Sequence, residues 1–295
     1  MFADDTNLIF SNENPESLIS NVNSQMEIVS EWFAFNKLSL NIEKTKYILF
    51  QPTRLLNLEP ALDQIKINEQ SIESVSHIKF LSVYIDKCLN WKEHLRIKCN
   101  FLSKNLATMC RIRSQISIEM LKLIYNSLIV PHLQYGIVAW GNPNTQDFKR
   151  IFMLQKKCIR IVYKSKYNAH TYPIFKKLGL LTIEDIYNIN CCKLALKRQR
   201  KQLPEYLLSL LPMFETTHNY VTRHSQNIRI THNATTYHQQ LLNVKIAKVW
   251  NNIPQDIKER SDISIKTHIK TLNRLLLAKY PTNCQIENCY ICQNT

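Results

Sequence analysis

The chain has 295 residues, 45% of them hydrophobic, so it can bury a substantial core and is globular in composition. Its three glycines are too scattered for a Gly-rich phosphate-binding loop, which excludes the common nucleotide-binding folds of that kind. The formal net charge is +15, and residues 87–202 hold 22 Lys/Arg against 5 Asp/Glu. A block this basic favours a nucleic-acid partner; a solvated basic surface and a membrane-facing surface are the alternatives.

The cysteines and the apolar stretches indicate the cellular compartment of the chain. Nine cysteines lie at scattered spacings, and no secretory signal opens the chain. We therefore expect a reduced, intracellular setting, in the nucleus or the cytoplasm. The most apolar stretch, residues 121–140, is interrupted by Lys122, Asn126 and Pro131. It predicts a buried helix and no membrane span.

Residues 1–86 are predicted to mix short strands with one helix. Apolar runs predict strands at 8–10, 46–50, 64–68 and 78–85. Pro15 and Glu16 open a helix whose apolar residues recur at three- and four-residue steps as far as Asn36.

After Asn90 the pattern becomes helical. Helical spacing of apolar residues predicts helices over 91–110, 118–133 and 148–163, and Thr182 predicts the start of another through Arg200. Beyond residue 203 short helical runs alternate with polar stretches. The fold class is therefore α+β, with the strands confined to the first third.

The helix predicted over 148–163 carries a basic stripe. One face is apolar, and the opposite face gathers Lys149, Lys156, Lys157, Arg160 and Lys164 with no acid between the first and the last. An ordinary solvated face would mix both signs. These five residues are the predicted nucleic-acid contacts.

Asp4 and Asp5 form an adjacent carboxylate pair between short apolar residues. Such a pair on a tight turn suits a two-metal phosphoryl-transfer site, because carboxylate oxygens ligate divalent ions. Without further context, an Asp-Asp turn serves more often for solubility and chain reversal.

The context resembles the reverse transcriptases of non-LTR retrotransposons, with jockey-like and CR1-like elements the nearest in pattern. Phe2-Ala3-Asp4-Asp5-Thr6 is similar to their F/Y-A-D-D-T box. Residues 32–50 match the pattern W-x-x-x-N-x-L-x-x-N-x-x-K-T-K-x-x-x-F, and residues 80–86, Phe-Leu-Ser-Val-Tyr-Ile-Asp, resemble F-L-G-V-x-I-D. The resemblance continues through 89–94, 124–136, 140–141 and 154–156, and more weakly through 222–225 and 250–254.

The resemblance implies an RNA-directed DNA polymerase. Residues 1–86 would be the C-terminal part of the palm, residues 87–202 a basic helical thumb and connecting region, and residues 203–295 a C-terminal region. Asp4 and Asp5 would be catalytic ligands of Mg²⁺ or Mn²⁺. The implied partners are an RNA template, a DNA primer or an RNA–DNA hybrid.

Two further segments acquire roles from the resemblance. Phe80, Leu81, Ser82 and Val83 would form the primer grip, where Ser82 replaces the usual Gly and adds a Cβ near nucleic acid. Lys44 or Lys46 would donate a proton to pyrophosphate, although a surface role for both is the alternative.

In the family the third carboxylate, the fingers and the nucleotide-contacting segment lie upstream of the Asp-Asp box, and this chain begins one residue before that box. We therefore expect a polymerase fragment that is inactive alone. The alternatives are a non-catalytic module that binds RNA or RNA–DNA hybrid, and an unrelated helical interaction protein.

Cys284, Cys289 and Cys292 give three thiols at metal-like spacing. Tetrahedral Zn²⁺ needs four ligands, and no fourth follows Cys292, although His268 could fold back. Zinc binding and free reduced cysteines are the two alternatives.

Overall fold

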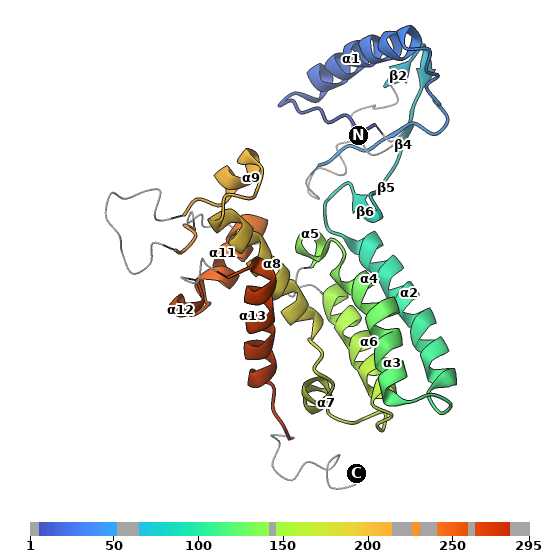
Figure 1. The fold of residues 1–295 in the computed structure, drawn as a ribbon. Helices are drawn as coiled ribbons and strands as arrows, with labels where there is room; N and C mark the ends of the chain where they lie inside the picture. Colours follow the sequence, from blue (N-terminus) through green and yellow to red (C-terminus); the bar gives the residue numbers. More distant parts are fainter. Residues whose placement is uncertain are drawn as a thin grey trace. The chain divides into compact units, whose positions relative to one another are not determined.

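The computed structural model describes residues 6–51, 65–141, 146–213, 226–230, 241–258 and 263–283. The chain divides into two compact units, Met1–His94 and Leu95–Thr295 (Figure 1). The division falls within helix α2 (Lys92–Ile112). The sequence predicts the end of the palm at residue 86 and the end of the thumb at residue 202. Both boundaries stay predictions.

The first unit is organised by helix α1 (Pro15–Phe35). Asn14 caps its start, because the Asn14 side-chain oxygen accepts from Glu16 N at 2.9 Å, and Pro15 occupies the first turn. Asn36 ends the helix and donates through Nδ2 to Trp32 O at 2.8 Å. The predicted helix over 15–36 is confirmed.

Three short strand pairs accompany α1. The parallel pair is β1 with β4, and the antiparallel pairs are β2 with β3 and β5 with β6. Their bounds are β1 (Lys46–Tyr47), β2 (Lys66–Ile67), β3 (Gln70–Ser71), β4 (Glu73–Ser74), β5 (His77–Phe80) and β6 (Val83–Asp86). The small core joins Met26 of α1 to Ile65, Ile67 and Ile72.

The predicted strands are only partly confirmed. Residues 8–10 are irregular, and the strand predicted over 46–50 ends at Tyr47. The strand predicted over 78–85 is instead a hairpin that turns at Leu81 and Ser82. An apolar run shows that a segment suits a strand, but pairing depends on a partner that the local pattern does not identify.

The second unit is helical among its described residues. Its elements are α3 (Ile118–Ile124), η2 (Tyr125–Ile129), α4 (Val130–Gln134), α5 (Ile137–Trp140), α6 (Gln146–Val162), α7 (Thr171–Leu178), α8 (Ile183–Gln199), α9 (Glu205–Leu210), α11 (Leu242–Asn251), α12 (Gln255–Lys258) and α13 (Ile265–Lys279). Helices were predicted at α2, α3 to α4, α6 and α8, and all are confirmed.

Helix α8 is the centre of this unit. It contacts α4, α5, α11 and α13 (Figure 1). Its buried side chains are spread around the helix and not along one stripe, as expected of a helix covered on several sides. They are Ile183, Ile186, Tyr187, Ile189, Cys191, Cys192, Ala195 and Leu196. Gly141 lies close to it, because a Cβ there would be 2.8 Å from the Tyr187 ring.

The segment from α3 to α4 contains one π-helical turn, η2. Val130 N donates to Tyr125 O, five residues earlier. Pro131 follows and has no N–H with which to continue the regular ladder. Tyr125 and Ile129, at the two ends of this turn, and Leu133 in α4 are all buried.

The helices of the described residues are too short or too polar for a membrane span. None of those between residues 6 and 283, outside the gaps above, is both long and apolar enough to cross a bilayer.

Candidate nucleic-acid interface

Two of the predicted metal sites lie outside the described residues. These are the Asp4-Asp5 pair and the cysteines Cys284, Cys289 and Cys292. Within the described ranges, no group of three or more His, Cys, Asp or Glu side chains is placed to hold a metal ion. His268 instead bonds Ile257 O through Nε2 at 2.8 Å and is buried.

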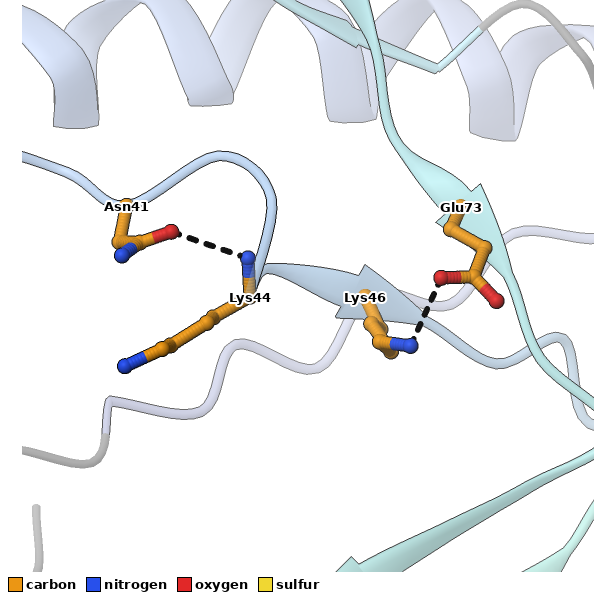
Figure 2. A network of polar contacts seen from close by, with 4 residues as sticks. All are labelled: Asn41, Lys44, Lys46 and Glu73. Carbon is orange, nitrogen blue, oxygen red and sulfur yellow. Dashed lines mark hydrogen bonds and ion pairs between the residues drawn. The ribbon is translucent and has the colours of Figure 1, made fainter.

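Lys44 and Lys46 follow a turn organised by Asn41. The Asn41 side-chain oxygen accepts from Lys44 N at 3.1 Å, and Thr45 Oγ1 donates to Asn41 O at 2.8 Å. Lys46, on β1, forms a 2.7 Å ion pair with Glu73 on β4. Figure 2 shows the Lys44 side chain directed away from that pair. A proton-donor role for either lysine stays a prediction.

The predicted primer grip is the hairpin of β5 and β6. Phe80 pairs with Val83, and the two residues between them, Leu81 and Ser82, both have positive φ, of 45° and 64°. Two residues with positive φ are typical of a type I′ turn, which favours Gly or Asn at both places. Phe80, Leu81 and Ser82 are exposed. The hairpin therefore displays an apolar tip.

Asp86 closes this hairpin and organises the start of α2. Its Oδ1 accepts from Cys88 N at 3.1 Å and Asn90 N at 3.0 Å, and its Oδ2 accepts from Trp91 N at 2.7 Å. Three backbone N–H groups thus occupy the carboxylate. Asp86 acts here as a turn-forming residue.

Four of the five predicted cations lie on α6, and Lys164 lies two residues beyond its end, in a turn where its φ is 55°. Lys149, Lys157 and Lys164 are exposed, whereas Lys156 and Arg160 are half-buried. Arg160 Nε donates to Ala169 O at 2.8 Å and so fixes the loop before α7 against α6. Three cations therefore face solvent, and two also support local structure.

Lys156 lies against aromatic rings. Its Nζ is 4.2 Å from the centre of the Phe152 ring and 5.8 Å from that of Tyr172. Partial burial, and then the charge of Arg160, lower the pKa of Lys156. The neighbouring rings favour the ammonium form through cation–π attraction, which opposes that shift.

The basic surface continues beyond α6 into α7. Residues 149–179 include nine Lys/Arg and no Asp/Glu. Lys176 forms an intramolecular contact: its Nζ donates to Tyr280 O at 2.5 Å, at the end of α13. Glu119 on α3 interacts electrostatically with Lys164: hydrogen bonds to its own backbone and to Ser117 and, less strongly, the charge of Lys164 lower the pKa of Glu119.

Sequence reasoning missed a buried polar junction next to this surface. Gln155, fully buried on α6, donates to Tyr125 Oη at 2.9 Å and to Leu181 O at 3.0 Å, and accepts from Ile183 N at 2.8 Å. One side chain thus joins η2, α6 and the start of α8. The sequence does contain one indication of this junction, because Gln155 is a single amide on an otherwise apolar helix face.

A second missed feature is a clasp around residues 226–228. Trp250 Nε1 donates to Gln226 O at 2.8 Å, and Lys258 Nζ donates to the side-chain oxygen of Asn227 at 2.8 Å. Asn251 pairs with both backbone groups of Ile228, each at 3.0 Å. Burial lowers the pKa of Lys258. Trp250 and Asn251, from the segment 250–254 that resembles the family, therefore take part in this clasp, whereas residues 222–225 lie outside the described residues.

The chain combines a helical unit that has a basic segment with a small α+β unit whose sequence resembles polymerase boxes. This combination suggests a nucleic-acid polymerase, and the comparisons agree at that level. The chain is similar to RNA-directed DNA polymerases of mobile elements, as its sequence predicted.

Two of these relatives come from Drosophila melanogaster. The probable RNA-directed DNA polymerase from transposon BS is 23% identical over 217 residues, which cover 72% of this chain and 24% of that protein. The RNA-directed DNA polymerase from mobile element jockey is 21% identical over 187 residues, 62% of this chain and 20% of that protein. This chain thus spans a quarter or less of each relative. No family model and no solved structure matches it.

Proposed function

We propose that this chain is a template-and-primer-gripping portion of the RNA-directed DNA polymerase of a jockey-like non-LTR retrotransposon. Residues 1–86 would be palm, and residues 87–202 would be thumb. The observation that carries the proposal is the basic surface of α6 and α7, nine cations without an acid over 149–179, in a chain similar to two such polymerases. Phosphates of an RNA template or RNA–DNA hybrid fit a surface of this sign.

The polymerase chemistry requires more than this segment. Asp4 and Asp5 are our proposed ligands of Mg²⁺ or Mn²⁺, and the hairpin tip at Phe80 to Val83 our proposed primer grip. The aligned stretches of 217 and 187 residues cover 24% and 20% of the two relatives. We propose that the 295 residues bind nucleic acid without incorporating nucleotides on their own. Cys284, Cys289 and Cys292 keep a proposed Zn²⁺ role, with free thiols as the alternative.

Charge reversal on α6 tests the grip. Lys149 and Lys157 are exposed, and no hydrogen bond is described for either ammonium group, so Lys149→Glu with Lys157→Glu should leave the fold intact. We expect this pair to weaken binding of a labelled RNA–DNA hybrid and to reduce the slope of log K against log salt by roughly 1 to 2. Fluorescence anisotropy over a salt series measures both quantities.

The matched control is Lys266→Glu with Lys270→Glu, two exposed lysines on α13. An equal loss of affinity in the two double variants would show that the lysines of α6 do not form a specific nucleic-acid interface.

Primer extension with Mg²⁺ or Mn²⁺ tests the proposal that the isolated chain does not incorporate nucleotides. Template-dependent synthesis that Asp4→Ala abolishes would contradict inactivity of the isolated chain.

A further inference from the structure

The corner between α6 and α7 combines cations with aromatic rings. Lys156 Nζ lies over Phe152 and within 5.8 Å of the Tyr172 ring centre, and Lys177 Nζ lies 5.6 Å from that of Tyr163. Each of these distances is within cation–π range. Binding a duplex by its phosphates needs the cations alone, so the rings call for a separate explanation.

Two tyrosine rings at this corner are available to a ligand. Tyr167 is 89% exposed and Tyr172 is 40% exposed, although a tyrosine ring ordinarily packs much of its apolar surface. The loop that carries Tyr167 is held at both ends, because Ser165 N donates to Arg160 O at 3.0 Å and Arg160 Nε donates to Ala169 O. The exposed ring therefore stands on a fixed loop.

Tyr172 is held in one orientation. Its ring meets that of Tyr280 edge to face, with centres 5.7 Å apart. Partial burial, followed by the charges of Glu184 and Asp185, raises the pKa of the Tyr172 hydroxyl. Those carboxylates repel phosphates near the Tyr172 hydroxyl, whereas Lys156, 5.8 Å from the ring centre, attracts them.

We propose that the corner of α6 and α7 binds single-stranded nucleic acid, with Tyr167 and Tyr172 stacking on unpaired bases and the lysines of α6 contacting phosphates. Bases inside a duplex are already stacked, so exposed rings can stack only on unpaired ones. Cations that track the backbone beside aromatic platforms are the usual combination in single-strand binding. The proposal rests on the proposed nucleic-acid function and specifies its ligand.

Substitution of Tyr167 in the full 295-residue chain tests this. We expect Tyr167→Ala to weaken binding of a short labelled single-stranded RNA by roughly 5- to 100-fold, the effect of losing one stacked base. Tyr167→Phe keeps the ring and should bind like the unmodified chain. Affinity for a fully paired RNA–DNA hybrid should stay the same in all three proteins. Anisotropy titrations measure these affinities, and circular dichroism checks the fold.

Tyr206→Ala is the matched control, because Tyr206 is 73% exposed on α9, away from the basic segment in sequence. Stacking is wrong if Tyr167→Ala weakens single-strand binding no more than Tyr206→Ala does, or weakens hybrid binding equally. If Lys149→Glu with Lys157→Glu weakens nucleic-acid binding but Tyr167→Ala does not, the stacking proposal is wrong and the proposed function stands. If neither variant weakens nucleic-acid binding, both the stacking proposal and the proposed function are wrong.

Discussion

Ser82 shows how one side chain is fitted to a backbone that favours glycine. With φ of 64° it occupies the left-handed region, next to Leu81 at 45°. A residue with a Cβ pays a conformational cost there that glycine avoids. In this chain, a glycine at position 82 would suit the backbone of the turn irrespective of any approach to nucleic acid.

Ser82→Gly should therefore stabilise the first unit. We expect an increase of about 0.5–1 kcal/mol in its free energy of unfolding, because relief of the left-handed strain exceeds the added entropy of the unfolded chain. Urea unfolding followed by far-UV circular dichroism measures the change.

The control for Ser82→Gly is Ser24→Gly, an exposed position inside α1. Glycine should destabilise a helix interior by about 0.5 kcal/mol relative to serine. Opposite signs at the two serines identify backbone conformation as the cause. Destabilisation at both would show that the hairpin turn does not need glycine-like freedom.

At the scale of elements, the buried Gln155 amide links three helical segments that are far apart in sequence. Its partners lie on η2 and on the connection into α8, at 2.8 to 3.0 Å. A buried polar group left without its partner costs about 1–3 kcal/mol, whereas a satisfied one adds less than that. The junction therefore specifies how α6 meets its neighbours.

Gln155→Leu should destabilise the second unit by about 2–4 kcal/mol, because it leaves a hydroxyl, a carbonyl and an N–H without this partner in the interior. Thermal unfolding measures the loss. Gln202→Leu is the control at an exposed position and should change stability by less than about 0.5 kcal/mol. Equal effects at the two glutamines would show that the junction is dispensable.

Helices were predictable from the sequence where apolar periodicity and caps agree. Thr182, predicted as an N-cap, accepts from Asp185 N at 3.2 Å, and the helix then follows as expected. The strands were less predictable, since β1 and β4 are two residues each and pair across 27 positions. Of the candidate site, the cations of α6 were predicted from their spacing, and their role as nucleic-acid contacts stays a prediction. Gln155 and Tyr280 were not predicted, because their partners lie on other elements.

The whole molecule consists of two units with unequal cores. The cluster of the first unit has Met26 and three isoleucines, whereas the second buries large side chains such as Trp140, Trp250 and Phe175. Stabilisation by apolar burial grows with the area removed from water. The contacts that α13 makes with α7 and α8 belong to the second unit and could not be read from local pattern in the tail.

Unequal cores predict two unfolding transitions, with the first unit unfolding at lower urea concentration. Trp140 and Trp250 are each 1% exposed, so their fluorescence reports the second unit. In the variant Trp32→Phe with Trp91→Phe, only Trp140 and Trp250 remain. Its fluorescence should therefore change at a higher urea concentration than its far-UV circular dichroism does. Coincident curves would indicate a single cooperative unit.

The π-helical turn η2 also bears on how this chain aligns with its relatives. A turn of this kind holds one residue more than a regular helix needs over the same length. Relatives with an unbroken helix here would lack one residue between Ile124 and Val130. A single-position gap in that stretch would therefore mark the extra residue of this turn, and removing one residue from it experimentally should leave a regular helix in which Val130 to Gln134 keep their present faces.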